Sequence, residues 1–181
     1  MSKPNPTAEF FKLGNAEGER VRRAAAELAV NDMVKWFNEG DGVVAVLDAT
    51  NSTKDRRRWI QQRCLGESLT PVFVESICDD VSLIRANVME VKTSSPDYKD
   101  QDPEKAAEDF MERIRNYENV YQSIDESDED DLTYVKLINV GRKIVANRLQ
   151  DFLQTRCIYF LTGLHIKTRS VWLSRVSNIA K

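Results

Sequence analysis

The chain has 181 residues, of which 41% are apolar and 30% charged, and its formal net charge is −3 at pH 7. This length and balance predict one globular domain with a sizeable core, and they give no basic footprint for nucleic acid or an anionic membrane. Three widely separated cysteines and one histidine lack the spacing of a metal cluster or a disulfide framework. Because the thiols are free, no apolar stretch reaches membrane-spanning length and the first residues are polar, we expect a cytoplasmic protein.

The first half of the chain alternates between apolar residues at helical spacing and short unbroken apolar runs. The run at 43–48 would be apolar on both faces of a strand, so we expect it to lie centrally in a covered, parallel sheet. Asp79 or Asp80 is expected to cap a later helix. The predicted elements are an irregular segment at 1–14, a helix at 17–37, a strand at 43–48, a helix at 54–65, a strand at 70–78 and a helix from about 80 to 92.

The second half continues this alternation. Pro103 fits the first turn of a helix with an apolar stripe that reaches Tyr121, and the acidic run at 125–131 is most simply a solvated loop. The other predicted elements are a polar loop at 93–102, a strand at 132–140, a short helix or coil at 143–154, and strands at 157–161 and 170–173. This spacing predicts an α/β fold whose mostly parallel sheet is flanked by helices.

Asp48 ends the most apolar run of the chain. In parallel sheets ligands bind beyond the carboxyl ends of the strands, and a carboxylate there typically holds Mg²⁺ or takes a proton from a substrate hydroxyl. The alternative is that Asp48 only helps to begin the next helix. No Gly-x-x-x-x-Gly-Lys-Ser/Thr segment occurs in the chain, so the usual partner of such an aspartate is missing.

Several further side chains suit a phosphorylated ligand, and each has a simpler explanation. Hydroxyl, amide and guanidinium groups at 49–58 favour an anion, or else form a helix cap followed by a solvated helix face. Arg113 and Tyr117 share a helix face, either as a sugar-phosphate grip or as an exposed stacking pair. Arg22 also fits a solvated face, Lys92 a helix dipole, and Cys78 a buried small side chain.

Six segments with near-constant spacing resemble the kinase domain of the 6-phosphofructo-2-kinase/fructose-2,6-bisphosphatase family, and the likeness extends from about residue 9 to about residue 173. These segments are 48–53, 73–78, 95–98, 109–114, 117–119 and 139–141. Members of the family move the γ-phosphoryl group of ATP to O2 of fructose 6-phosphate. The resemblance therefore implies a P-loop-kinase-like α/β fold, with ATP and Mg²⁺ as cofactors and fructose 6-phosphate as the ligand.

The resemblance also implies individual roles. Asp48 matches the catalytic aspartate, which acts on Mg²⁺ indirectly, and Cys78 matches a cysteine of the kinase site. The positions that match the fructose 6-phosphate site are Arg22, Thr50, Arg56, Lys92, Arg113 and Tyr117. The positions that match the ATP site are Asn87, Val88, Met89, Glu90, Val91 and Lys92.

The chain departs from the family pattern at both ends. It begins after the first strand and the phosphate loop, so we expect a partial kinase domain at 15–169 that is inactive alone, with unpaired apolar edges around 43–47. Residues 170–181 resemble the start of the bisphosphatase domain, but Val176 stands where the family has its histidine, so no phosphatase activity is expected.

Two alternatives remain open. One is a non-catalytic module that binds fructose 6-phosphate, associates with itself or joins an intact family member by strand addition. The other is a gene fragment that does not fold stably.

Overall fold

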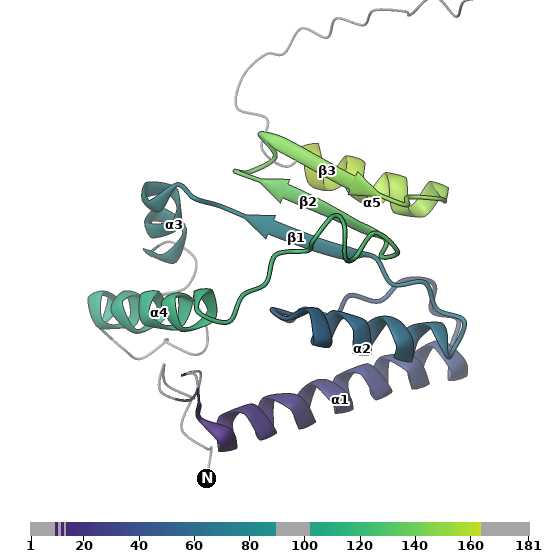
Figure 1. Ribbon diagram of the computed structural model, residues 1–181, viewed down its shortest axis with the longest axis horizontal. Helices are drawn as coiled ribbons and strands as arrows, with labels where there is room; N and C mark the ends of the chain where they lie inside the picture. The colour runs from purple at the N-terminus through teal and green to yellow at the C-terminus, as the bar shows by residue number, and fades with distance from the viewer. Residues whose placement is uncertain (1–9, 11, 13, 90–101, 164–181) are drawn as a thin grey trace, which may run out of the picture.

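Helices and strands alternate along the chain, as the apolar pattern predicts. The structure is a computed structural model that describes residues 10, 12, 14–89 and 102–163 (Figure 1). Its elements are α1 (Ala16–Glu39), α2 (Lys54–Leu65), β1 (Phe73–Ile77), α3 (Val81–Asn87), α4 (Pro103–Glu118), β2 (Tyr134–Ile138), β3 (Lys143–Asn147) and α5 (Phe152–Gly163). Within these ranges, no helix combines the length and the apolarity that crossing a bilayer requires.

The three strands form one sheet in the order β1-β2-β3. β1 pairs with β2 in parallel, with Phe73 opposite Tyr134, whereas β2 pairs with β3 antiparallel, with Ile138 opposite Lys143. Figure 1 shows α1 and α2 below the sheet, α5 beside β3, and α3 with α4 beyond the end of β1. The expected α/β fold with a sheet flanked by helices is confirmed.

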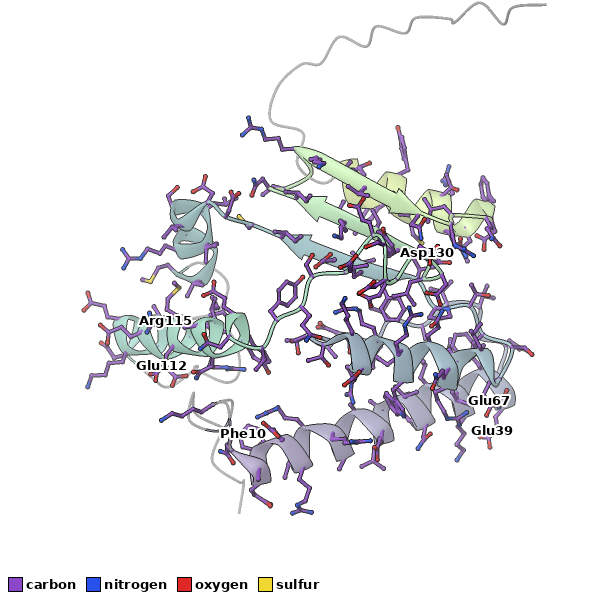
Figure 2. The ribbon with its side chains drawn as sticks, in the orientation of Figure 1. Phe10, Glu39, Glu67, Glu112, Arg115 and Asp130 are labelled. Atoms are coloured by element: carbon purple, nitrogen blue, oxygen red, sulfur yellow. The ribbon has the colours of Figure 1, made fainter. Side chains whose placement is uncertain are left out.

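The core lies between α2 and the sheet. Met33 of α1, Leu47 and Trp59 pack against a cluster of buried side chains. The members of this cluster are Ile60, Cys64, Phe73, Ile124, Leu132 and Tyr134. The carboxyl-terminal ends of α1 and α2 also meet, since Asn38 donates to Glu67 at 3.4 Å (Figure 2).

Local capping signals set the helix starts that the sequence predicts. The side chain of Thr53 accepts a hydrogen bond from the Arg56 backbone at 3.3 Å, and α2 spans the predicted residues. Asp80, one of the two expected caps, accepts from the backbone of Ser82 and Leu83 before α3. Pro103 occupies the first turn of α4 as expected.

The predicted strand at 43–48 is wrong, because the run has no strand pairing within the described part of the chain. A strand needs a neighbour to satisfy its backbone groups, and here β1 pairs only with β2. The side chains of Val43, Val44 and Val46 are 78%, 48% and 87% exposed. The run thus lacks strand pairing within the described residues, as the expected unpaired edges require, but it does not form the predicted strand.

Two predictions near the end of the chain are also wrong. Residues 143–147 form β3 rather than a helix, because their β-branched side chains sit on a strand that turns back along β2. Residues 157–161 lie in α5 rather than in a strand, since a short apolar run does not by itself distinguish the two states. Asp151 caps this helix through the Gln154 backbone at 2.7 Å. The predicted strand at 170–173 lies outside the described residues.

Candidate functional site

Asp48 lies in the loop between α1 and α2, and its side chain is exposed. It lines a cavity of about 750 Å³ together with Lys35 and Trp36 of α1. Thr50 lines a second cavity of about 1060 Å³, and residues 44–47 border both. The structure thus places the catalytic candidate and the nearest sugar-phosphate candidate beside open space.

The backbone just after Thr50 is held tightly. Asn51 adopts a positive φ of 42°, which is uncommon for a residue with a side chain. The Ser52 carbonyl accepts from the Gln122 backbone at 2.8 Å, and the Gln122 side chain accepts from the Lys54 backbone at 2.9 Å. The loop that carries Asp48 and Thr50 is therefore tied to the linker after α4.

The three consecutive arginines of α2 have different surroundings, so they do not act together as one anion-binding stretch. Arg57 is buried and forms an ion pair with Glu129, and Arg58 pairs with Asp131 at the surface. Arg56 lies over the Trp59 ring at 4.9 Å. Burial lowers the pKa of Arg56, and Arg23 on α1 lowers it further, against the opposite effect of Glu27. Arg56 therefore differs from Arg57 and Arg58 in lying near the charged groups of α1, with its side chain half-buried.

The acidic run at 125–131 is a loop, but the expectation that it is simply solvated is wrong. Glu129 is only 1% exposed, and Lys54 pairs with both Asp125 (3.6 Å) and Asp128 (2.9 Å). Figure 2 labels Asp130 in this loop, between the sheet and α2. Although burial raises the pKa of Glu129, hydrogen bonds from Arg57 and the Asp125 backbone hold that pKa below its ordinary value. The carboxylates of this loop therefore neutralise the basic side chains of α2.

The remaining sugar-phosphate candidates come from α1 and α4. Arg22 is half-buried at the start of α1, donates to the Phe10 carbonyl and lies 5.5 Å from the Phe10 ring (Figure 2). Arg113 and Tyr117 are both half-buried on α4, and the Arg113 guanidinium lies 5.4 Å from the Phe110 ring. All three side chains pack partly against the fold instead of extending into solvent.

The candidates beyond β1 are described only in part. Cys78 is half-buried immediately after the strand, and its thiol lies 3.9 Å from the Asp80 carbonyl. Val88 is buried and Met89 is 47% exposed, in a turn that extends α3. The side chain of Asn87 and the whole of residues 90–92, which include Lys92, lie outside the described residues.

A buried polar cluster beside the larger cavity was not anticipated. Glu75 on β1 stands directly opposite Lys136 on β2, and their charged groups are 3.7 Å apart. Tyr121 donates its hydroxyl to Glu75, and burial first, then this carboxylate, raise the pKa of Tyr121. A charge inside the apolar run at 70–78 was the signal that sequence reasoning overlooked, since buried carboxylates are rare unless paired.

Asn139 begins one of the segments that carry the family resemblance, but no role was predicted for it. Its backbone donates to the Ile77 carbonyl at 2.8 Å, and its side chain accepts from the Asp79 backbone at 3.1 Å. It thereby joins the carboxyl ends of the two parallel strands. Among the described residues, no three histidine, cysteine, aspartate or glutamate side chains gather as a metal site.

The fold and the loop at Asp48 define the class of protein as an α/β domain consistent with a P-loop kinase-like architecture. A family model described as 6-phosphofructo-2-kinase matches residues 1–168. The chain belongs to the 6-phosphofructo-2-kinase family.

Named relatives agree with this assignment. A 6-phosphofructo-2-kinase/fructose-2,6-bisphosphatase of Caenorhabditis elegans is 44% identical over 169 residues, which are 93% of this chain and 37% of that protein. A 6-phosphofructo-2-kinase/fructose-2,6-bisphosphatase 4 of Rattus norvegicus is 44% identical over 175 residues, which are 97% of this chain and 37% of that protein. A fructose-2,6-bisphosphatase of Saccharomyces cerevisiae is 39% identical over 168 residues, covering 93% and 37%. The chain thus spans 37% of the length of these relatives.

Proposed function

We propose that this chain is the sugar-phosphate-binding part of a 6-phosphofructo-2-kinase, which phosphorylates fructose 6-phosphate at O2 with ATP. The observation that carries the proposal is the family match over residues 1–168, which includes every residue given a role above. The exposed carboxylate of Asp48 beside a cavity supports it, because Mg²⁺ is usually held by one or two carboxylates together with substrate phosphates. In the complete site Asp48 would also receive the proton of the attacking hydroxyl.

The three arginines from separate helices supply the charge that a sugar phosphate needs. Arg22, Arg56 and Arg113 are each partly buried, which makes their hydrogen bonds to an anion stronger than those of a fully solvated guanidinium group. Thr50 and Tyr117 add hydroxyl groups, and Lys92 adds an ammonium group. Cys78 and residues 87–92 are proposed to border the nucleotide.

We propose further that the 181 residues alone bind the sugar phosphate but do not transfer the phosphoryl group. They contain no Gly-x-x-x-x-Gly-Lys-Ser/Thr segment to cradle the phosphates of ATP. Loss of one charge-stabilising donor typically costs about 3–4 kcal/mol of transition-state stabilisation, and a phosphate loop supplies several.

A thermal melt with and without saturating fructose 6-phosphate tests this function. Binding to the folded state raises the melting temperature, and Arg113→Ala should abolish that rise. Arg115→Ala is the matched control, because Arg115 is an exposed arginine two residues away on the same helix. A cooperative transition that fructose 6-phosphate does not move would contradict sugar-phosphate binding.

The larger cavity favours a second candidate function, a module that binds a partner by strand addition. Its lining includes residues 43–47 and residues 69–76, which contain most of β1. β1 stands at the edge of the sheet and the run at 43–47 has no strand pairing among the described residues, so both offer backbone edges beside this space. An extended apolar segment of an intact family member or of a second copy would pair with these edges.

Size-exclusion chromatography with light scattering tests the partner module. The chain should form a complex with an intact 6-phosphofructo-2-kinase, and Val46→Lys should weaken it by placing a charge against the cavity. Leu28→Lys is the control, since Leu28 is 71% exposed on α1 and does not line the cavity. A chain that stays monomeric and forms no complex with the intact enzyme would contradict this candidate function.

A further inference from the structure

The most completely satisfied charge pair among the described residues joins Arg57 and Glu129. Their side chains are 4% and 1% exposed, respectively. The Arg57 Nε atom donates to Glu129 Oε1 at 2.8 Å, and Nη2 donates to Oε2 at 2.8 Å. This two-point geometry is the strongest form of an arginine–carboxylate contact, and it fixes the orientation of both groups.

The other groups of the pair bind backbone. Arg57 Nη1 donates to the carbonyls of Asn51 at 3.2 Å and Gln122 at 2.8 Å. Glu129 Oε2 also accepts from the Asp125 backbone at 3.0 Å. One ion pair thus joins α2, the loop after Asp48, the linker after α4 and the acidic loop.

Stability alone does not explain such an arrangement. A buried ion pair often contributes no more than apolar side chains of similar size would, because two charges must be taken out of water. What the pair adds is geometry at Asn51, whose positive φ persists only where the surroundings hold it. Asn51 follows Thr50 directly and lies three residues after Asp48.

We propose that Arg57 and Glu129 are positioning residues, which hold the loop at 49–53 so that Thr50 and Asp48 face their ligand. The resemblance to the kinase family assigns no role to either residue. The positioning follows from the hydrogen bonds themselves, whereas the identity of the ligand rests on the proposed function. Arg57 lines the larger cavity beside Thr50, but its guanidinium group and the Glu129 carboxylate are buried against each other and the backbone, so we assign them an action through the loop.

The neighbouring pair of Arg58 and Asp131 provides a matched comparison. It joins the same helix to the same acidic loop, but its side chains are 33% and 45% exposed. The Arg58 side chain also donates to the Asp128 carbonyl, and among the described residues it makes no hydrogen bond with the loop at 49–53. Loss of this pair should leave the loop unchanged.

The decisive variant is the double substitution Arg57→Met/Glu129→Leu. Replacing both buried charges by apolar side chains of similar size is expected to keep the melting temperature within a few degrees. Hydrogen–deuterium exchange at the Lys54 and Gln122 amides, which tie the loop to the linker, should nevertheless rise about tenfold, while exchange in β2 stays the same. Asp131→Asn should change neither.

An equal rise in β2 would show that the pair only supports the scaffold, and no rise would show that the loop is held by other contacts. Either result overturns the proposal, as does rapid exchange at both amides in the unsubstituted chain. The second readout is the rise in melting temperature with fructose 6-phosphate, which the double variant should lose. If the unsubstituted chain has protected amides but shows no rise, the proposed function fails and the positioning role stands.

Discussion

Two neighbouring regions of the molecule differ in how fully their groups are satisfied. Where α2 meets the acidic loop, the charges of Lys54, Arg57 and Arg58 all have carboxylate partners. In the run at 43–47, by contrast, three valine side chains are exposed beside the cavities, and the backbone has no strand pairing among the described residues. The first region is complete within the chain, whereas the second has the composition of a buried strand without the neighbour that buries it.

This contrast separates two kinds of sequence signal. A charge that is buried must find its partner in the same folded unit, since an isolated buried charge is very costly. An apolar run carries no such obligation and can remain exposed until another segment covers it. The ion pairs between α2 and the acidic loop are therefore satisfied within the fold of this chain. The apolar run at 43–47, by contrast, indicates a neighbouring segment that the described residues do not supply.

The largest effect is expected from a substitution that breaks the contact between α2 and the acidic loop. Glu129→Ala leaves the Arg57 charge buried without its carboxylate, so it should lower the free energy of unfolding by about 3–5 kcal/mol. Asp131→Ala, which removes the exposed carboxylate of the neighbouring pair, should cost less than about 1 kcal/mol. Urea denaturation of both variants measures the difference, and equal losses would refute the claim that burial separates the two pairs.

A smaller effect is expected from acid. The pKa values of Glu129, Asp131 and Asp125 all lie below their ordinary values of 4.5, 3.8 and 3.8 in the folded chain. Groups with lowered pKa values stabilise the fold above those ordinary values and lose that contribution as the pH falls through the folded ones. Melting temperature should therefore be constant down to about pH 5 and decline below it.

Ser127→Ala provides the control for the acid response. The Ser127 hydroxyl, which donates to Asp125 at 2.6 Å, is the largest cause of the lowered pKa of that carboxylate, ahead of the backbone amides of Ser127 and Asp128. Its removal should raise the Asp125 pKa toward its ordinary value, which lowers the melting temperature at neutral pH and makes the decline in acid shallower. An unchanged dependence of melting temperature on pH would mean that the Asp125 carboxylate contributes nothing to the stability of the contact between α2 and the acidic loop.

How much of this could be predicted from sequence depends on whether the signal was local. Asp80 and Pro103 mark helix starts as predicted, because a capping or first-turn residue acts within three residues of itself. The strands at 43–48 and 157–161 were wrong, since an apolar run does not reveal whether another strand lies beside it.

The candidate site shows the same division. Among three consecutive arginines, helical periodicity singles out Arg57, because it lies three residues before Ile60 and seven before Cys64 on the buried face of α2. Sequence reasoning grouped it with its neighbours as one anion-binding stretch. That Glu129 is its partner could not be predicted from sequence. All seven residues at 125–131 have acidic or hydroxyl side chains, and only the folded loop shows which of them is buried beside Arg57.

The smallest expected effect sharpens the comparison, because it contrasts two valines of the same size. Val135→Ala in β2, where the side chain is 0% exposed, should cost about 2 kcal/mol for the lost burial. Val46→Ala, at 87% exposure, should change the free energy of unfolding by less than about 0.5 kcal/mol. If an extended segment fills the larger cavity, the same Val46→Ala substitution should become costly only in the complex, as a weaker binding constant. A large loss in the chain alone would mean that Val46 is already buried and that the run at 43–47 needs no further partner.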